Sequence, residues 1–313
     1  MSDSTFSIVF PGQGSQSVGM LGALSESYPS VTETFSEASE ALGYDLWELV
    51  QNGPAEALNQ TTKTQPAMLA AGVAVWRVWQ SQGGAVPQQM AGHSLGEYTA
   101  LVCAGAIAFA DAVKLVAERG RFMQEAVPEG TGGMAAILGL DDDKIREVCS
   151  TAAEGEVVEA VNFNSPGQVV IAGNKAAVDR ACGLAKEAGA KRALPLPVSV
   201  PSHCALMKPA AERLAEMLAT IDVSSTTIPV LHNVSVETAD DADTIRQMLA
   251  AQLYSPVRWV ETVGKMAASG TTTLLEAGPG KVLAGLTKRI DRNLKGVAMF
   301  DPDTLKNALE TIE

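Results

Sequence analysis

The chain has 313 residues, 46% of them hydrophobic and only 5% aromatic, and its formal net charge at pH 7 is -13. This length allows one large domain or two modest ones, and the abundance of Ala, Gly and Val is typical of an α/β protein. The acidic balance argues against a nucleic-acid-binding protein, which needs a basic surface. No apolar run reaches the roughly 20 residues that cross a bilayer, so no membrane association is expected.

The polar residues 1–5 lack the pattern of a secretory leader. The four cysteines are widely spaced without a Cys-x-x-Cys pair, which predicts reduced thiols in a cytoplasmic protein. No two of the three histidines have the spacing of metal ligands on one helix, so we expect no metal site.

The N-terminal region begins with a predicted buried strand at 7–10. It runs into the glycine-containing loop 11–16, whose backbone could approach a ligand closely, although an ordinary strand-to-helix turn fits the same residues. Helices are predicted at 31–42 and 66–80, with Pro66 at the start of the second, where proline is tolerated.

Residues 92–96 form the pattern Gly-His-Ser-Leu-Gly. Between a strand and a helix this pattern predicts a nucleophile elbow, a sharp turn that exposes the hydroxyl of Ser94. The apolar segment 95–104 is the expected helix, and its free N–H groups would suit an oxyanion. A glycine-rich turn that merely contains a serine is the alternative.

One face of the predicted helix 111–126 is apolar at helical spacing. Arg119 falls in the middle of that face, whereas Arg121 belongs to a charged solvent face. An inward guanidinium needs a buried carboxylate, from the protein or from a substrate. An internal salt bridge or a side chain that snorkels to the surface would also explain it. The apolar positions are Ala112, Leu115, Val116, Phe122, Met123 and Ala126.

Residues 128–198 predict the order β-α-β-β-α-β, which is ferredoxin-like. The strands are expected at 134–140, 157–163, 168–172 and 191–196, and the helices at 144–153, with Asp141 as N-cap, and at 175–188. The turn 164–167 has proline and glycine placed for type II. We therefore predict an inserted small subdomain.

After this insertion the α/β alternation resumes. Helices are predicted at 209–220, 244–253 and 282–290, and strands at 228–234 and 271–276. The predicted fold is α/β, with a catalytic subdomain formed by residues 1–127 and 199–313 and a small subdomain formed by residues 128–198.

Taken together, these motifs resemble the malonyl-CoA:acyl-carrier-protein transacylases of type II fatty-acid synthesis, over essentially the whole chain. The resemblance implies an α/β-hydrolase-like catalytic core. It is carried by Pro-Gly-Gln-Gly-Ser-Gln at 11–16, Gln-Pro at 65–66, Gly-His-Ser-Leu-Gly-Glu-Tyr at 92–98, Arg-Gly at 119–120, Val-Asn-Phe-Asn-Ser-Pro-Gly-Gln at 161–168, Pro-Ser-His at 201–203 and Glu-Ala-Gly-Pro-Gly at 276–280.

The resemblance implies that Ser94 is the nucleophile and His203 the general base, since a serine hydroxyl attacks well only when a base accepts its proton. The family holds its histidine by a backbone carbonyl, which maps to Gln252, and residues 251–254 carry no acid. A thioester is already activated, so this weaker assistance could suffice. His93 is interpreted as support for the elbow and His232 as structural.

The oxyanion hole maps to the backbone N–H groups of Gln13 and Leu95. Arg119 maps to the residue that clamps the free malonyl carboxylate, because a planar guanidinium can make two parallel hydrogen bonds to it. No cofactor is implied.

The implied partners are malonyl-CoA, coenzyme A and acyl carrier protein, and a monomer is expected. Carrier proteins are acidic, so an acidic enzyme would repel them at long range. We therefore expect a local basic rim drawn from Lys191, Arg192, Lys208, Lys288 and Arg289.

Three other interpretations stay open. A serine hydrolase uses the same elbow, but no acid stands in a plausible triad position. An acyltransferase for methylmalonyl or uncharged groups would differ in its dependence on Arg119. A non-enzymatic scaffold would not need Ser94, His203 and Arg119 together.

Overall fold

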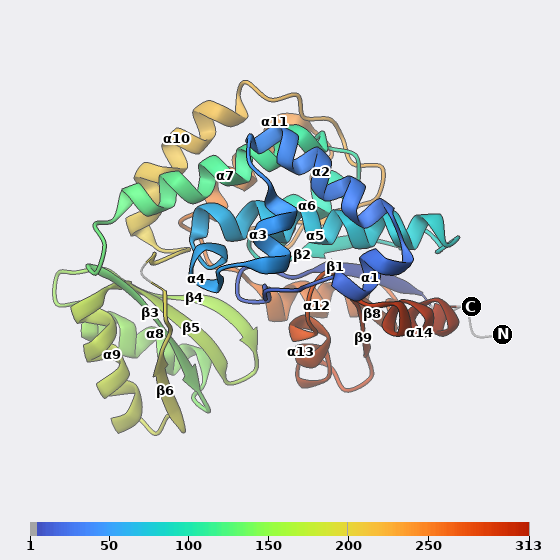
Figure 1. Ribbon diagram of the computed structural model, residues 1–313. Helices are drawn as coiled ribbons and strands as arrows, with labels where there is room; N and C mark the ends of the chain where they lie inside the picture. Colours follow the sequence, from blue (N-terminus) through green and yellow to red (C-terminus); the bar gives the residue numbers. More distant parts are fainter. Residues whose placement is uncertain (1–4, 199, 313) are drawn as a thin grey trace.

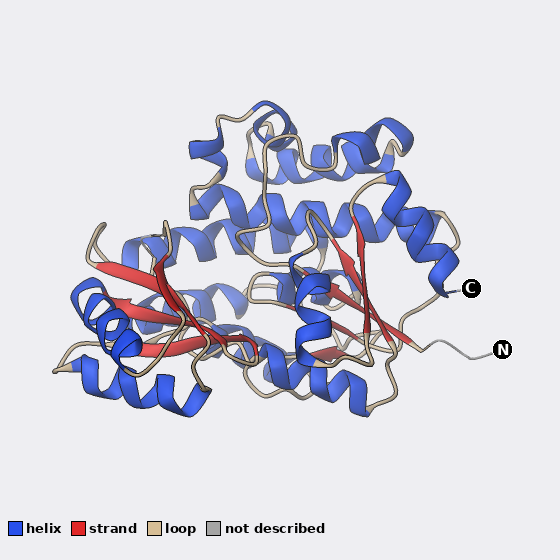
Figure 2. Cartoon of the chain, turned by 90° about the horizontal axis from the view of Figure 1, so that it is seen from below, coloured by secondary structure: helices blue, strands red, loops and turns tan. Residues whose placement is uncertain are grey.

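A computed structural model describes residues 5–198 and 200–312. Two separate sheets lie side by side, each covered by helices (Figures 1 and 2). The fold is therefore mixed α/β, as predicted. No helix within the described ranges combines the length and the apolar character that crossing a membrane requires.

The larger sheet is parallel, with the strand order β7-β2-β1-β8-β9. Its strands are β1 (Phe6–Phe10), β2 (Met90–Gly92), β7 (Val230–Leu231), β8 (Thr273–Ala277) and β9 (Lys295–Met299). Because carboxyl ends of parallel strands meet at one edge, the loops after β1, β2 and β7 converge there.

Helices cover both faces of this sheet (Figure 1). Ile8 and Phe10 of β1 face the larger core, whereas Val9 faces the smaller one, as alternation along a strand requires. The helices, including the short 3₁₀ turn η1, are α1 (Gly22–Ser27), α2 (Ser30–Leu42), α3 (Leu46–Asn52), α4 (Ala55–Leu58), α5 (Thr61–Ser81), α6 (Gly96–Cys103), α7 (Phe109–Ala126), η1 (Ala205–Met207), α10 (Lys208–Leu218), α11 (Ala242–Gln252), α12 (Trp259–Ala268), α13 (Val282–Ile290) and α14 (Pro302–Ile312).

The smaller sheet is antiparallel, with the order β4-β5-β3-β6. Two helices pack on one face of it and bury a core of their own. Its elements follow the predicted β-α-β-β-α-β order: β3 (Gly132–Leu138), α8 (Asp142–Ala153), β4 (Val158–Ser165), β5 (Gln168–Asn174), α9 (Lys175–Glu187) and β6 (Arg192–Pro195).

Several local predictions were wrong. Pro66 lies inside α5 and not at its start, because Gln60 accepts bonds from the amides of Lys63 and Thr64 and so begins the helix earlier. Asp141 is the N-cap of α8, as predicted, although its side chain makes no capping hydrogen bond. The predicted strand 228–234 is limited to Val230–Leu231. No prediction was made for α1, α3, α4, α12, β9 or α14.

Candidate active site

Ser94 stands at a sharp bend between β2 and α6, with φ of +52°, a conformation that is uncommon outside glycine. The two flanking glycines allow strand and helix to cross. A Cβ on Gly92 would lie 1.8 Å from the carbonyl carbon of Gly96, and one on Gly96 would lie 2.1 Å from the carbonyl oxygen of Phe10. The sequence Gly-x-Ser-x-Gly therefore forms the predicted strand–turn–helix bend.

The hydroxyl of Ser94 meets a histidine that lies 109 positions later in the chain. Ser94 Oγ is 2.7 Å from Nε2 of His203, and Nδ1 of the same ring is 2.8 Å from the carbonyl oxygen of Gln252. The His203 amide also donates to the carbonyl of Leu253 at 2.9 Å. His203 is thus held against the C-terminal end of α11, whose partial negative charge favours a positive ring.

The imidazole of His203 is only 2% exposed. Burial, together with the nearby positive charge of Arg119, lowers the pKa of His203 from its ordinary 6.5 to about 3. The ring is therefore neutral near pH 7 and free to accept a proton from Ser94.

Arg119 projects from the inner face of α7 and is 1% exposed, as the apolar pattern predicted. Its partners are two neutral amides: Nη1 donates to Oε1 of Gln65 at 2.8 Å, and Nη2 donates to Oε1 of Gln252 at 3.0 Å. Its Nε has no hydrogen-bond partner among the described residues. Arg121, by contrast, pairs with Glu118 and Glu125 on the solvent side, as expected.

The two residues predicted to supply the oxyanion hole line the same region. Leu95 follows Ser94 directly, and Gln13 comes from the loop after β1. Within the described ranges neither N–H donates a hydrogen bond. Gly12 lets this loop reach the elbow, because a Cβ there would lie 2.5 Å from the carbonyl oxygen of His93.

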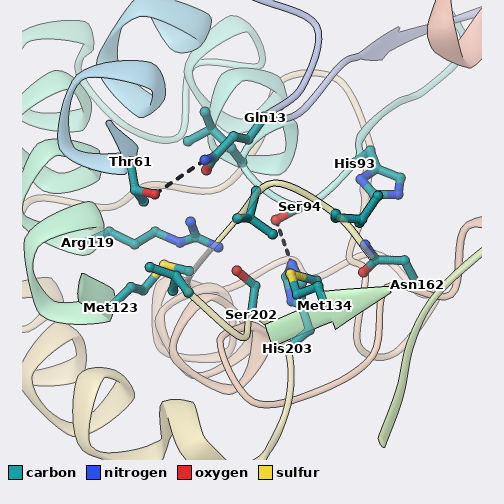
Figure 3. A pocket seen from close by; sticks show the side chains of 14 residues that line it. Gln13, Thr61, His93, Ser94, Arg119, Met123, Met134, Asn162, Ser202 and His203 are labelled. Carbon is teal, nitrogen blue, oxygen red and sulfur yellow. Dashed lines mark hydrogen bonds between the residues drawn. The ribbon is translucent and has the colours of Figure 1, made fainter. Parts of the chain in front are cut away.

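One cavity of about 140 Å³ between the two sheets is lined by Ser94, His203, Arg119, Gln13 and Leu95. Figure 3 shows Ser94 bonded to His203, with Arg119 reaching in from the α7 side and Gln13 from the first loop. The small sheet contributes Met134 and Asn162 to the wall. The cavity thus combines a serine with a neutral base, a buried cation and the two residues of the predicted oxyanion hole, which suits transfer of an acyl group that carries a negative charge.

Comparison with known proteins agrees with this arrangement. Residues 7–299 match the acyl transferase domain family. The malonyl CoA-acyl carrier protein transacylase of Salmonella typhimurium strain LT2 is 65% identical over 304 residues, covering 97% of this chain and 98% of that protein. The chain belongs to this transacylase family. The predicted family resemblance and the acyltransferase activity class are thereby confirmed.

Solved structures of the transacylase family share the whole fold. The acyl carrier protein S-malonyltransferase of Vibrio cholerae is 63% identical, with a TM-score of 0.96 and coverage of 97% of this chain and 100% of that one. A second structure is described as a type II PKS acyl-carrier protein in complex with its malonyl-transacylase. It is 59% identical, with a TM-score of 0.98 and coverage of 98% and 100%.

Sequence reasoning missed several polar residues that this transacylase fold brings to the elbow. Gln65 stood in a quoted motif but was given no role, and its contact with Arg119 joins α5 to α7. Asn233 spans the bend, because its Oδ1 accepts from the Ser94 amide at 2.8 Å and its Nδ2 donates to the carbonyl of Gly92 at 2.7 Å. The one sequence feature that could have indicated this role of Asn233 is its location just past a short parallel strand.

The two remaining histidines of this transacylase chain also have polar partners. His93 Nε2 is 2.7 Å from Oδ1 of Asn164, near the C-terminal end of β4, so the ring ties the elbow to the small sheet. His232 Nδ1 is 2.7 Å from Oε1 of Glu97. His232 is not a residue of the sheet, because β7 ends at Leu231.

Proposed function

We propose that this acyltransferase moves a malonyl group from malonyl-CoA to the phosphopantetheine thiol of acyl carrier protein, and thereby supplies extender units for fatty-acid synthesis. The observation that carries the proposal is the buried guanidinium of Arg119 beside the Ser94–His203 pair. A buried guanidinium with an unpartnered N–H favours an acyl group that brings its own carboxylate.

In the first half-reaction Ser94 Oγ attacks the thioester carbonyl while its proton passes to Nε2 of His203. The C–S bond then breaks, coenzyme A leaves with the proton from the imidazolium, and a malonyl-serine ester remains. The N–H groups of Gln13 and Leu95 stabilise the negative oxygen of the tetrahedral intermediate.

In the second half-reaction the pantetheine thiol gives its proton to His203, and its sulfur attacks the ester. Ser94 leaves as the alkoxide and recovers the proton from the imidazolium. Gln252 keeps the required tautomer, because its carbonyl accepts from Nδ1 and leaves Nε2 facing the serine. Both thiols end in the same pantetheine arm, so one cavity serves both steps, and the chemistry requires neither metal nor cofactor.

The names of the relatives support the substrates. The Salmonella relative is named for malonyl CoA and acyl carrier protein, and the complex above pairs a malonyl-transacylase with an acyl-carrier protein. A monomeric state and a cytoplasmic location stay predictions.

We further propose a division into two subdomains. Residues 1–127 and 199–313 would form the α/β-hydrolase-like catalytic part, supported by the parallel sheet with the elbow at its carboxyl edge. Residues 128–198 would form the ferredoxin-like part, supported by the order β4-β5-β3-β6 and by its separate core.

Mass spectrometry of the protein after incubation with malonyl-CoA tests the function. We expect one added malonyl group in the wild type, none in Ser94→Ala, and loss of the group when acyl carrier protein is added. Release of the group to water at the same rate without an acceptor thiol would favour a hydrolase instead.

A further inference from the structure

A buried carboxylate lies directly behind the nucleophile. Glu97, in the first turn of α6, is 0% exposed. Its Oε1 is 2.7 Å from Nδ1 of His232, and its Oε2 accepts from the amide of Asn233 at 3.0 Å and from Nε2 of Gln252 at 2.7 Å. Since backbone and side-chain amides only donate here, Oε2 is an acceptor and the ionised form of the carboxylate fits the site.

The negative charge of Glu97 is not balanced by a positive charge on His232. Its Nε2 has no hydrogen-bond partner among the described residues. A doubly protonated ring would therefore bury an unsatisfied N–H, which is costly. The neutral ring with its proton on Nδ1 satisfies the contact to Glu97, so the negative charge has to be balanced elsewhere.

The side-chain amide of Gln252 connects this carboxylate to Arg119. Its Nε2 donates to Glu97 and to the carbonyl of Ser94, and its Oε1 accepts from Arg119. The orientation of the amide is fixed by chemistry, because a guanidinium can only donate and both acceptors can only accept. A cation, one amide and an anion thus stand in a row in a region from which water is excluded.

Arg119 forms no direct ion pair with a carboxylate in the described ranges. A buried cation without compensating charge is strongly unfavourable, and a charge one amide away interacts strongly where the effective dielectric constant is low.

We propose that Glu97 is the counter-charge of Arg119 in the empty enzyme. It acts through the Gln252 amide as a positioning residue, and holds the guanidinium in place until the substrate carboxylate arrives. The identity of that carboxylate as malonyl rests on the proposed function, whereas the pairing of Glu97 with Arg119 does not.

A double-mutant cycle on thermal stability tests the pairing. Glu97→Gln removes the charge at constant shape. Its amide can donate to Nδ1 of His232 only if the ring carries its proton on Nε2, which has no partner among the described residues. This cost is the same in both backgrounds and therefore cancels in the cycle. Arg119→Gln removes the cation. In the protein that keeps Arg119, we expect Glu97→Gln to lower Tm by on the order of 5 °C. In the Arg119→Gln protein, the same substitution should lower Tm by less than half as much.

Glu276→Gln is the matched control. Glu276 is also 0% exposed, but it bonds the backbone of Ala284 and not Arg119 or Gln252. Its change in Tm should be the same in both backgrounds. Equal Tm losses for Glu97→Gln in both backgrounds would overturn the pairing. If Glu97→Gln does not fold by itself, recovery in the double variant supports the pairing, and failure in both backgrounds overturns it.

Substrate preference gives a second readout that loss of stability does not change. Without the anion of Glu97, the guanidinium should attract the malonyl carboxylate more strongly. The ratio of kcat/KM for malonyl-CoA over acetyl-CoA should then rise by roughly tenfold in Glu97→Gln, and fall in Arg119→Gln. If the ratio falls in Arg119→Gln but is unchanged or lowered in Glu97→Gln, the pairing of Glu97 with Arg119 is contradicted. The proposed function is not affected by that result. Absence of malonyl transfer by the wild type would sink the function while the stability cycle still decides the pairing.

Discussion

Arg119 lies close enough to His203 for its positive charge to help depress the pKa of the imidazole. The cation proposed to hold the substrate therefore also affects the proposed base. When an acyl group with a carboxylate neutralises Arg119, that part of the depression is removed. The base then becomes stronger as the reactive complex forms.

This relationship predicts a shift in the pH profile. The neutral imidazole is the active form, so the rate falls as pH drops through the pKa of His203, which lies well below the ordinary value. In Arg119→Ala the repulsion is gone, and the acid limb of kcat/KM should move to higher pH. Steady-state rates with acetyl-CoA from about pH 2.5 to pH 8 check this, because the window includes the pKa of about 3 in the wild type and the same substrate serves both proteins. Superimposed acid limbs would contradict it.

Arg119→Ala should reduce kcat/KM for malonyl-CoA by about two to three orders of magnitude. The estimate follows from the loss of charge-assisted hydrogen bonds worth about 1.5–3 kcal/mol each. Turnover of acetyl-CoA should change much less, since acetyl has no carboxylate. Arg119→Lys keeps the charge but lacks the planar guanidinium. Its kcat/KM for malonyl-CoA should therefore lie between those of the wild type and Arg119→Ala. Equal losses for both substrates in Arg119→Ala would argue against a malonyl clamp.

Glu276 is expected to reduce stability as pH rises from 4.5 to about 7. Burial raises its pKa from 4.5 to about 7, and its Oε1 has no partner in the described part of the chain. Between those two values the folded protein binds more protons than the unfolded chain, so this group makes stability fall as pH rises from 4.5 to 7.

Glu276→Gln should remove that dependence. Its unfolding free energy relative to the wild type should increase from pH 5 to pH 7 by up to about 3 kcal/mol and then level off. Urea unfolding at four pH values measures this. A difference that stays constant with pH would show that the carboxyl titrates normally.

The exposed end of α13 should contribute to carrier-protein binding. Lys288 and Arg289 lie in its last turn, and Arg289 Nη1 donates to Oε1 of Gln168 on the small sheet at 3.1 Å. Charge reversal at both positions should raise KM for acyl carrier protein severalfold and leave KM for malonyl-CoA unchanged, with a smaller effect at high salt. Lys306→Glu on α14 serves as a control for charge reversal away from this end of α13. A KM for carrier protein that does not change would remove this part of the expected rim.

Local patterns in the sequence determined much of this protein. Runs and spacings of hydrophobic residues predicted β1, α7 and the small βαββαβ unit, and the apolar stripe on α7 indicated that Arg119 points inward. The Gly-x-Ser-x-Gly pattern located the bend because the close approach of Gly92 to Gly96 lies within these five residues. These properties depend on neighbours along the chain.

Only the tertiary structure decided what those side chains contact. The sequence could not show that the partners of Arg119 are Gln65 and Gln252, which lie 54 and 133 positions away. The predicted strand 228–234 was wrong beyond Leu231, because there the chain leaves the sheet and Asn233 bonds the elbow. Hydrogen bonds between distant segments are set by how helices and sheets pack, and no periodicity along the chain encodes which polar groups packing brings face to face.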